Sequence, residues 1–462
     1  MATAKRALTS AFTDLAALFG ERFSTAESVR SHHARGETFY PPHPPDAVVF
    51  AQSVDEVAHA VTICARERIP IVPYGVGSSL EGQVNALYGG VTIDLSQMNR
   101  VVRVSADDLD CTVEAGVTRK QLNSHLRDLG LFFPIDPGAD ASLGGMAATR
   151  ASGTNAVRYG TLRENVLGLT VVTAEGKVIH TGGRARKSAA GYDLTRLFVG
   201  SEGTLGVLCE VTLRLYGLPE AIAAATCAFP SLEAAVRTVI LIIQAGIPIA
   251  RMELLDEVQV DACNRFSKLS MPLTPAVFFE FHGTKRGVDE QIEQVGEIAK
   301  EYGASDFRWA HKPEERSALW QARHDAYYAG MALRPGKRGW ATDVCVPISA
   351  LADNLLATKA DIEANGLLAP IVGHVGDGNF HVSFIIDPDD PAEYGPAKAV
   401  NQRMIRRALA SGGTCTGEHG IGFAKLGYLK EEHGEAVELM RAIKQALDPH
   451  HLMNPGKVIP PA

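Results

Sequence analysis

The sequence has few cysteines, and none of them is placed for a shared structural task. The seven cysteines are an odd number and stand singly along the 462 residues, without a CxxC pair. This spacing excludes a disulfide scaffold, an all-cysteine zinc site, a clustered iron–sulfur motif and a c-type haem motif. We expect buried thiols in a reducing compartment, and we predict a cytoplasmic location.

The sequence also lacks an excess of positive charge and a long apolar run. Its 45 Lys and Arg residues stand against 53 Asp and Glu residues, a net charge of −8, so nucleic-acid binding is not expected. The N-terminal residues do not form the apolar core of a secretory signal. The longest apolar stretch, Val239–Ile243, is far shorter than the ~20 residues of a membrane span. We expect no transmembrane segment, while peripheral contact with an inner membrane stays open.

What the sequence contains is typical of a folded protein with more than one domain. Hydrophobic residues make up 46% and charged residues 21%, and 462 residues correspond to about two to four domains. Short strands alternate with helices up to about Tyr216, and one helix opens with a capping box at Ser53 and Glu56. We predict a pair of α+β domains, with a helical segment over 1–40, a first domain over 41–218 and a second domain over 219–462.

Four glycine-rich segments lie in the first domain. The first, GVGSSLEG at 75–82, nearly matches the dinucleotide-binding fingerprint, but it lacks the third glycine and no amphipathic helix follows it. We therefore reject a Rossmann NAD site. The others are PIDPGADASLGGMAA (134–148), RASGTNAVRYGT (150–161) and VGSEGTLG (199–206). So much bare backbone indicates a large, flat, phosphate-bearing ligand that the main chain approaches closely.

These segments resemble the FAD-binding domain of the vanillyl-alcohol-oxidase/PCMH flavoprotein family. The resemblance implies an α+β fold, with a PCMH-type FAD-binding domain followed by an α+β substrate (cap) domain that contains an antiparallel sheet. It also implies that about the last 35 residues return to the FAD domain. Some members attach FAD covalently through a histidine in the first loop. This chain has Ser78 and Ser79 there, so non-covalent FAD is implied.

The same resemblance implies a set of flavin-binding residues. Those around the pyrophosphate would be Pro73, Gly75, Gly77, Ser78, Ser79, Leu80 and Gly82. Those along the isoalloxazine ring and ribityl chain would be Pro137, Gly138, Ser142, Gly145, Ser152, Gly153, Asn155 and Tyr159. The adenosine end would be held by Glu202, Gly203 and Val207, and Asn454 lies in a C-terminal NPGK turn that returns to the flavin.

The sharpest feature of the second domain is a possible histidine hairpin, IVGHVGDGNFHVSFII at 371–386. Asp377-Gly378 is a two-residue turn signal between apolar runs. A turn there would place His374 directly opposite His381, with Cβ atoms about 4.5–5.5 Å apart, which suits two imidazoles on one metal ion. The alternative is a pair of core histidines with satisfied hydrogen bonds.

A second motif, TGEHGIG at 416–422, contributes Glu418 and His419. Alone it would be an exposed loop. With the two histidines, Glu418 completes a set that leaves coordination positions open for substrate, as a catalytic divalent metal requires. Zinc is our first choice, and manganese, iron or cobalt would also suit this set.

These two motifs resemble the C-terminal half of the metal-dependent 2-hydroxy-acid dehydrogenases of the same flavin family. Further stretches, such as RMELLDEV, LWQARHDAYYA and LDPHHLMNPGKV, are most similar to the D-lactate dehydrogenase (cytochrome) branch. The resemblance implies oxidation of D-lactate or a similar small D-2-hydroxy acid to the 2-oxo acid, here pyruvate, with hydride transfer to flavin N5. His419 would remove the hydroxyl proton and Arg323 would pair with the substrate carboxylate. Electrons would pass to an external cytochrome, quinone or electron-transfer flavoprotein.

Several alternatives stay open. The D-2-hydroxyglutarate branch has a lysine shortly before the position of Asp343, where this chain has Ala341 and Thr342, but Lys337 and Arg338 could substitute. A glycolate oxidase catalytic subunit is a further alternative. A metal-dependent hydrolase without flavin would leave the glycine segments unexplained, and a non-catalytic subunit would not need the histidine pair. The sequence carries no mark of oligomeric state, for which a homodimer is the working expectation.

Overall fold

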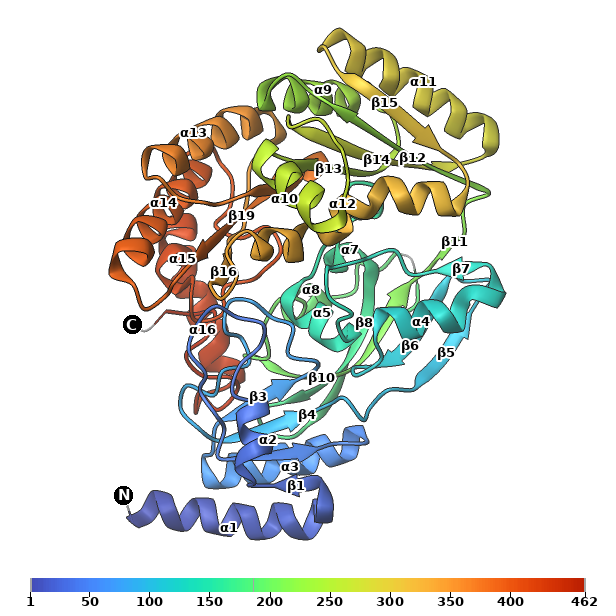
Figure 1. Cartoon of the computed structure of the whole chain (residues 1–462). Coiled ribbons are helices and arrows are strands. Elements are labelled where there is room, and N and C mark those ends of the chain that lie inside the picture. Colours follow the sequence, from blue (N-terminus) through green and yellow to red (C-terminus); the bar gives the residue numbers. More distant parts are fainter. Residues whose placement is uncertain (1, 186, 461–462) are drawn as a thin grey trace. The chain divides into compact units, whose positions relative to one another are not determined.

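The computed structural model describes residues 2–185 and 187–460, and it divides into two compact units (Figure 1). The first unit comprises Met1–Ser152, Gly160–Leu218 and Glu418–Ala462, and the second comprises Gly153–Tyr159 and Pro219–Gly417. The C-terminal residues therefore pack with the N-terminal ones. Among the described residues, no helix is both long and apolar enough to cross a lipid bilayer.

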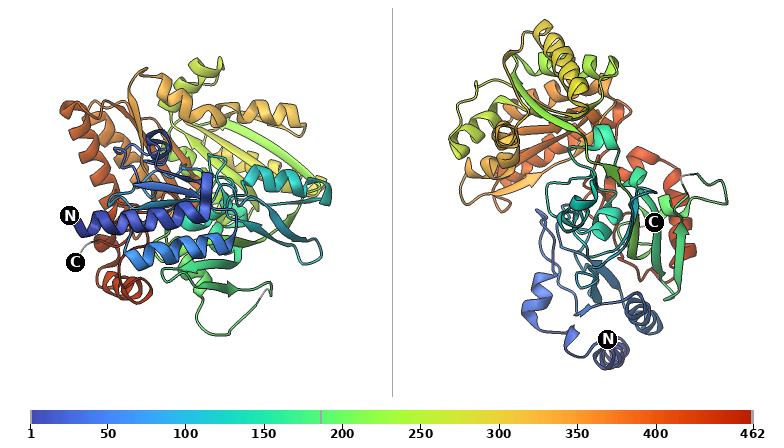
Figure 2. Two further views of the ribbon diagram at one scale, coloured as in Figure 1. Left: turned by 90° about the horizontal axis from the view of Figure 1, so that it is seen from below. Right: turned by 90° about the vertical axis from the view of Figure 1, so that its right-hand side faces the viewer.

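A small, mostly parallel sheet lies at the N-terminal end of the first unit. Its order is β1 (Phe23–Ser24), β2 (Ala47–Phe50), β4 (Val91–Asp94) and β3 (Ile71–Tyr74). Helices α1 (Ala2–Phe19) and α3 (Val54–Glu67) lie side by side and bury apolar side chains with this sheet (Figure 2). The Ser53 side chain accepts the Glu56 amide at the start of α3, which confirms the predicted helix start.

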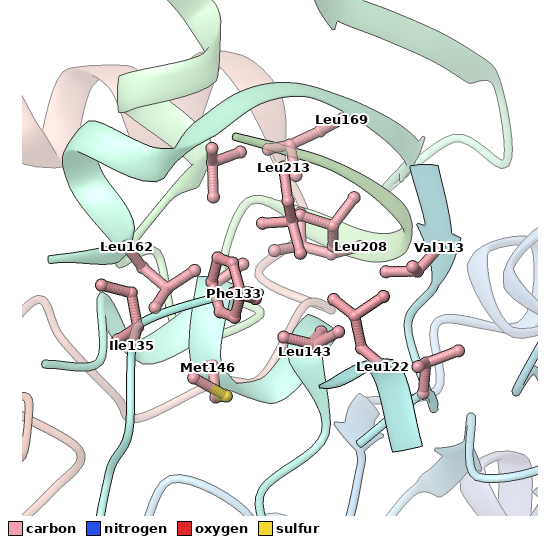
Figure 3. Close-up of a cluster of buried hydrophobic side chains, with 14 of the residues drawn as sticks. Val113, Leu122, Phe133, Ile135, Leu143, Met146, Leu162, Leu169, Leu208 and Leu213 are labelled. Carbon is pink, nitrogen blue, oxygen red and sulfur yellow. The ribbon is translucent and has the colours of Figure 1, made fainter. Parts of the chain in front are cut away.

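A five-stranded antiparallel sheet forms the rest of the first unit. Its order is β5 (Val101–Ser105), β6 (Asp110–Glu114), β10 (Gly206–Arg214), β8 (Val166–Thr173) and β9 (Val178–Gly182). Leu169, Leu208 and Leu213 of this sheet pack with Leu143 and Met146 of a helix beneath it (Figure 3). This core fixes the positions of the loops that leave the strands.

Shorter elements complete the first unit. The helices are α2 (Glu27–His32), α4 (Arg119–Leu126), α5 (Leu143–Thr149), α7 (Leu162–Asn165), α8 (Leu194–Phe198), α15 (Leu426–His433) and α16 (Ala436–Leu447). The strands β7 (Leu131–Phe132) and β11 (Tyr216–Gly217) form a separate pair. A parallel bridge between Ile71 and Met453 joins the C-terminal segment to β3.

The second unit is built on one antiparallel sheet. Its order is β15 (Ser305–Ala310), β12 (Ala221–Ala228), β14 (Ala276–Gly283), β13 (Ile249–Leu255), β18 (Ile371–His374), β19 (Asn379–Ile386) and β16 (Arg338–Ala341), with β17 (Val344–Cys345) also paired to β19. Side chains alternate between its faces. Phe278 of β14 packs in a core with Trp320, whereas its neighbour Phe279 stacks with Phe281.

Helices cover this sheet (Figure 1). They are α6 (Ala156–Tyr159), α9 (Leu232–Gln244), α10 (Glu257–Ser267), α11 (Lys285–Glu301), α12 (Pro313–Ala332), α13 (Leu351–Ala364) and α14 (Pro391–Ala410). Helices α10 and α12 pack on each other, as do α9 and α11, and α13 packs on both α9 and α14. The architecture confirms the predicted α+β fold with an antiparallel sheet in the C-terminal part of the chain.

Candidate functional site

Three of the four glycine-rich segments come together within the first unit. A Cβ atom at Gly75, just after β3, would collide with the Ser142 hydroxyl of the second segment. A Cβ atom at Gly203 would come too close to the Pro73 ring at the end of β3. Segments that are far apart in the sequence thus touch through bare backbone, as a close cradle for a large ligand requires.

Hydroxyl groups in these loops are buried without a protein partner. The Oγ atoms of Ser79, Ser142 and Ser201 are inaccessible to solvent and make no hydrogen bond within the part of the chain that the structure describes. Buried polar atoms are nearly always hydrogen-bonded, so these three donors are matched to a ligand with many acceptors. A phosphate-bearing, polyhydroxylated cofactor such as FAD fits them. Ser79 and Ser142 are among the expected flavin residues, whereas Ser201 was missed, although it lies in the VGSEGTLG segment.

Two other expected flavin residues hold the loops together. The Glu202 carboxylate accepts the amides of Ile421 and Gly422 at 2.7 and 2.8 Å. The Asn454 amide donates to the carbonyl oxygens of Gln83 and Glu202 at 2.9 and 2.7 Å. Burial raises the pKa of Glu202 to about 7, because neutral amides only partly replace water. These bonds connect the first loop, the 199–206 loop, the GEHG motif and the C-terminal turn.

The remaining expected flavin residues fall at different places. Val207 is buried in the core between β10 and the parallel sheet, so only its backbone can face a ligand. Gly153, Asn155 and Tyr159 belong to the second unit. There the side-chain Oδ1 of Asn155 accepts a hydrogen bond from Arg251 Nε at 3.0 Å, and the Tyr159 hydroxyl lies 2.8 Å from His282 Nδ1 of β14. The other expected residues lie in or beside the loops of the first unit: Gly77, Ser78, Leu80, Gly82, Pro137, Gly138, Gly145 and Ser152.

The histidine hairpin forms, but its predicted register is wrong. His374 pairs with Asn379 and His381 pairs with Val372, so the two histidines are not directly opposite. The turn uses four residues, because 375–377 form a short 3-10 turn and Gly378 (φ +77°) closes it in the left-handed region that favours glycine. The shift is two residues, which keeps both side chains on one face as diagonal neighbours. Their ring centroids are 5.3 Å apart.

Both histidines are oriented through their Nδ1 atoms. His374 Nδ1 lies 2.6 Å from a Glu253 oxygen, and His381 Nδ1 lies 2.9 Å from the Thr342 carbonyl oxygen. A neutral imidazole that donates from Nδ1 carries its lone pair on Nε2, which is the usual metal-binding arrangement. Both side chains are at least nine-tenths buried. The pair is therefore preset to present two nitrogen ligands.

The segment that leads to Glu418 is anchored beside this pair. The Thr416 hydroxyl donates to Asp343 at 2.6 Å, and the same carboxylate lies 3.7 Å from His381 Nδ1. A Cβ atom at Gly417 would collide with the Asn379 amide, so only glycine fits there. Glu418 is the next residue and its Cα is about 3.8 Å from that of Gly417. The donor set of two histidines and one carboxylate fits zinc, manganese, iron or cobalt.

Arg323, on α12, is connected to the same histidine. Its Nε donates to Glu253 at 2.7 Å, and Glu253 also receives His374. Burial alone would raise the pKa of Glu253, but its interactions with His374 and Arg323 hold that pKa below its ordinary value. Glu253 was missed from the sequence. The signal was an acidic residue between two apolar neighbours, Met252 and Leu254.

His419 lies in the first unit beside the first glycine loop. Its Nδ1 is 3.6 Å from Glu81 Oε1, and its carbonyl oxygen accepts the Gln83 amide at 2.7 Å. Lys425 Nζ lies 3.3 Å from the same Glu81 oxygen. The imidazole is thus held next to a carboxylate.

Lys337 and Arg338 lie away from the histidine pair. Lys337 Nζ pairs with Asp387 at 3.0 Å. Arg338 faces Ile386, five residues from His381 along β19, which corresponds to about 17 Å. This geometry gives no support for either residue as a replacement for the lysine of the dicarboxylate branch.

Comparison with known proteins defines the class. Residues 45–182 match a family model described as "FAD binding domain", and residues 218–458 match "FAD linked oxidases, C-terminal domain". The chain belongs to the FAD-linked oxidase family.

Relatives with curated names support this class. A zebrafish protein named "Probable D-lactate dehydrogenase, mitochondrial" is 56% identical over 95% of this chain and 89% of its own length. An Arabidopsis thaliana "D-lactate dehydrogenase [cytochrome], mitochondrial" is 47% identical over 90% of this chain and 74% of its own. The "Glycolate oxidase subunit GlcD" of Bacillus subtilis is 35% identical over 90% and 89%. The cytoplasmic location stays a prediction from the cysteines alone.

Solved structures confirm the fold. p-Cresol methylhydroxylase with substrate bound superposes with a TM-score of 0.80 at 19% identity, over 98% of this chain and 96% of that one. 4-Ethylphenol oxidase from Gulosibacter chungangensis gives 0.79 at 20% identity, over 99% and 98%. The predicted PCMH-type architecture is therefore confirmed.

Proposed function

We propose that this chain oxidises D-lactate, or a similar small D-2-hydroxy acid, to the corresponding 2-oxo acid in an FAD- and metal-dependent reaction. The observation that carries the proposal is the bridge made by Glu253. It holds the ligand His374 and the cation Arg323 on the two oxygens of one carboxylate. A 2-hydroxy acid carries its carboxylate and hydroxyl on adjacent carbons, and it needs a metal and a cation at this short spacing. The names of the zebrafish and Arabidopsis relatives favour D-lactate.

His374, His381 and Glu418 would hold the metal, with zinc as the first choice. The loops that contain Ser79, Ser142 and Ser201 would hold FAD non-covalently. When bound, FAD accepts a hydride and the metal lowers the pKa of the substrate hydroxyl. Every other task belongs to side chains of this chain.

Arg323 orients the substrate. Its Nε donates a hydrogen bond to Glu253. Its two terminal nitrogens form a planar pair of donors that matches the two oxygens of a carboxylate. His419 then takes the hydroxyl proton at its imidazole, since the ordinary pKa of histidine, about 6.5, suits a base at neutral pH. The Cα hydrogen leaves with its electron pair, and a 2-oxo acid remains.

The substrate is proposed to be a small monocarboxylate. Ala341 and Thr342 offer no second cation before Asp343. Arg338 lies at the far end of β16, and Lys337 precedes that strand. A second carboxylate on the substrate would therefore lack a partner there. Glycolate is the second candidate, because the Bacillus subtilis relative is named as a glycolate oxidase subunit.

The electron acceptor is proposed to be a cytochrome, as in the name of the Arabidopsis relative. Steady-state oxidation of D-lactate, measured with a cytochrome, a quinone or an electron-transfer flavoprotein in turn, would identify the acceptor.

The substrate panel tests this function. The purified protein would be mixed anaerobically with D-lactate, L-lactate, glycolate or D-2-hydroxyglutarate, and bleaching of the visible flavin band followed. We expect the fastest bleaching with D-lactate. Faster bleaching with D-2-hydroxyglutarate would overturn the monocarboxylate assignment, and a colourless active protein would support a flavin-free hydrolase.

A further inference from the structure

Glu253 lies within β13, a strand of the second unit's sheet. Its neighbours along the strand, Met252 and Leu254, are buried apolar residues, and Glu253 itself is fully buried. A charged carboxylate in such a place is costly unless both oxygens are paired. The chain therefore keeps Glu253 for a purpose other than packing.

The two oxygens of Glu253 serve two different elements. Oε1 lies 2.6 Å from His374 Nδ1 at the end of β18, and Oε2 accepts Arg323 Nε of α12 at 2.7 Å. The register of the sheet brings the strands together, because Leu254 pairs with Gly373, the residue before His374. Glu253 is thus the common partner of an expected metal ligand and the expected substrate clamp.

We propose that Glu253 is a positioning residue that sets both the metal-binding nitrogen of His374 and the orientation of Arg323. This inference rests on the proposed function. By receiving the Nδ1 hydrogen, Glu253 fixes the tautomer whose lone pair is on Nε2, and its charge increases the basicity of that ligand. By accepting the hydrogen bond from Arg323 Nε, Glu253 orients the two terminal nitrogens of Arg323 toward a substrate carboxylate. Metal affinity and substrate affinity are coupled through one side chain.

The test is Glu253→Gln in the full-length flavoprotein. The amide has the same size, but it offers only one acceptor oxygen, so either His374 or Arg323 faces its NH2 group as donor against donor. We expect zinc affinity, measured by competition with a chromophoric chelator, to fall about tenfold to hundredfold. The KM for D-lactate rises in the same variant. Unchanged zinc affinity together with an unchanged KM would overturn the proposal.

Two further variants separate coupling from ordinary damage. Asp256→Asn removes another fully buried carboxylate, which pairs with Lys359 at 2.6 Å and caps α10. It should lower the melting temperature without changing zinc affinity. Arg323→Lys keeps the charge but loses the planar fork, so the KM rises while zinc affinity changes less than about threefold. Weaker zinc binding in Asp256→Asn to the same degree as in Glu253→Gln would contradict a specific role.

A measurement on the unmodified protein covers the case in which Glu253→Gln does not fold. Long-range 15N spectra of the histidine rings report the tautomer, with His374 assigned by its absence in His374→Asn. We expect the Nδ1–H form, and an Nε2–H form would overturn the proposal. The outcomes also separate the two claims: without flavin bleaching by any 2-hydroxy acid the proposed function fails, while the zinc and tautomer results still decide the role of Glu253.

Discussion

Two buried glutamates, Glu202 in the first unit and Glu253 in the second, differ in the partners that surround them. Glu202 faces two backbone amides, and burial raises its pKa to about 7. Glu253 is equally buried, yet His374 and Arg323 hold its pKa below the ordinary value. Both carboxylates are buried, so the groups that face each one decide the direction of its pKa shift.

The difference extends to the surroundings of each residue. The first unit offers bare backbone, neutral amides and unpaired hydroxyls, which suit a large cofactor with many weak contacts. The second unit offers a few charged groups in fixed pairs, which suit a small anion and a metal ion. Changes at the charged groups of the second unit, and at Glu418 and His419 of the first unit, should therefore affect turnover most strongly. Changes in the glycine-rich loops of the first unit should mainly affect flavin binding and stability.

The largest effect is expected for His381→Ala. Its Nδ1 bonds to a backbone carbonyl, and the nearby Asp343 keeps its hydrogen bonds from Asn379 and Thr416 in the variant. Loss of a metal ligand should lower kcat for D-lactate about 10³-fold, because metal catalysis is worth several kcal/mol. Flavin content should stay the same. The control is His311→Ala, at a half-exposed position of the same unit. Equal activity of the two variants would contradict the role of His381 in turnover.

A somewhat smaller loss is expected for His419→Gln. The contribution of a general base begins at about 10²-fold in rate, so anaerobic flavin reduction by D-lactate should slow about 10²-fold. Zinc affinity and flavin content should change little, because the side chain is not in the expected donor set. His433→Gln on α15 is the matched control in the first unit. A change of less than about tenfold would remove His419 from the base role.

Glu202→Gln tests the raised pKa of Glu202 through the pH dependence of the free energy of unfolding. Between pH 4.5 and about 7 folded Glu202 keeps a proton that the unfolded chain releases, so the free energy of unfolding falls as pH rises. Relative to Glu202→Gln, the unmodified protein should lose about 3 kcal/mol across this window. Glu81 and Lys457 also act on Glu202, and the lowered pKa of Lys457, about 7, adds the opposite slope only above this window. Urea unfolding at several pH values measures the difference, and parallel curves would contradict it.

The smallest effect is expected for Ser142→Ala. Its buried hydroxyl makes no hydrogen bond within the described residues, so the stability of the flavin-free protein should stay the same. FAD affinity should fall about fivefold, since one hydrogen bond is worth about 1 kcal/mol. Thr92→Val removes another buried, unpaired hydroxyl in β4 and should not affect FAD affinity. Equal losses in both variants would argue against a hydroxyl contact to FAD.

The sequence predicts what depends on local patterns. The Ser53 cap, the alternating strand β10 and the paired histidines all follow from short-range periodicity and turn residues. The predicted histidine register was wrong by two residues, because the turn contains a short 3-10 turn over 375–377 before Gly378. The shared face was still right, since an even shift preserves the side of a strand.

The residues that sequence reasoning missed act across long separations in the chain. Glu253 meets Arg323 and His374 only after the sheet brings β13 and β18 together with α12. Ser201 stands out only when its hydroxyl is seen to be buried without a partner. Such roles depend on three-dimensional packing, which a single sequence does not record.

The most direct test of the account is flavin reduction by D-lactate after metal removal. The protein would be treated with a chelator, shown to retain its flavin, and mixed anaerobically with D-lactate before and after zinc is restored. We expect slow bleaching without metal and fast bleaching on restoring zinc or manganese. Equally fast bleaching of the metal-free flavoprotein would contradict the central claim that the paired histidines and Glu418 supply a catalytic metal.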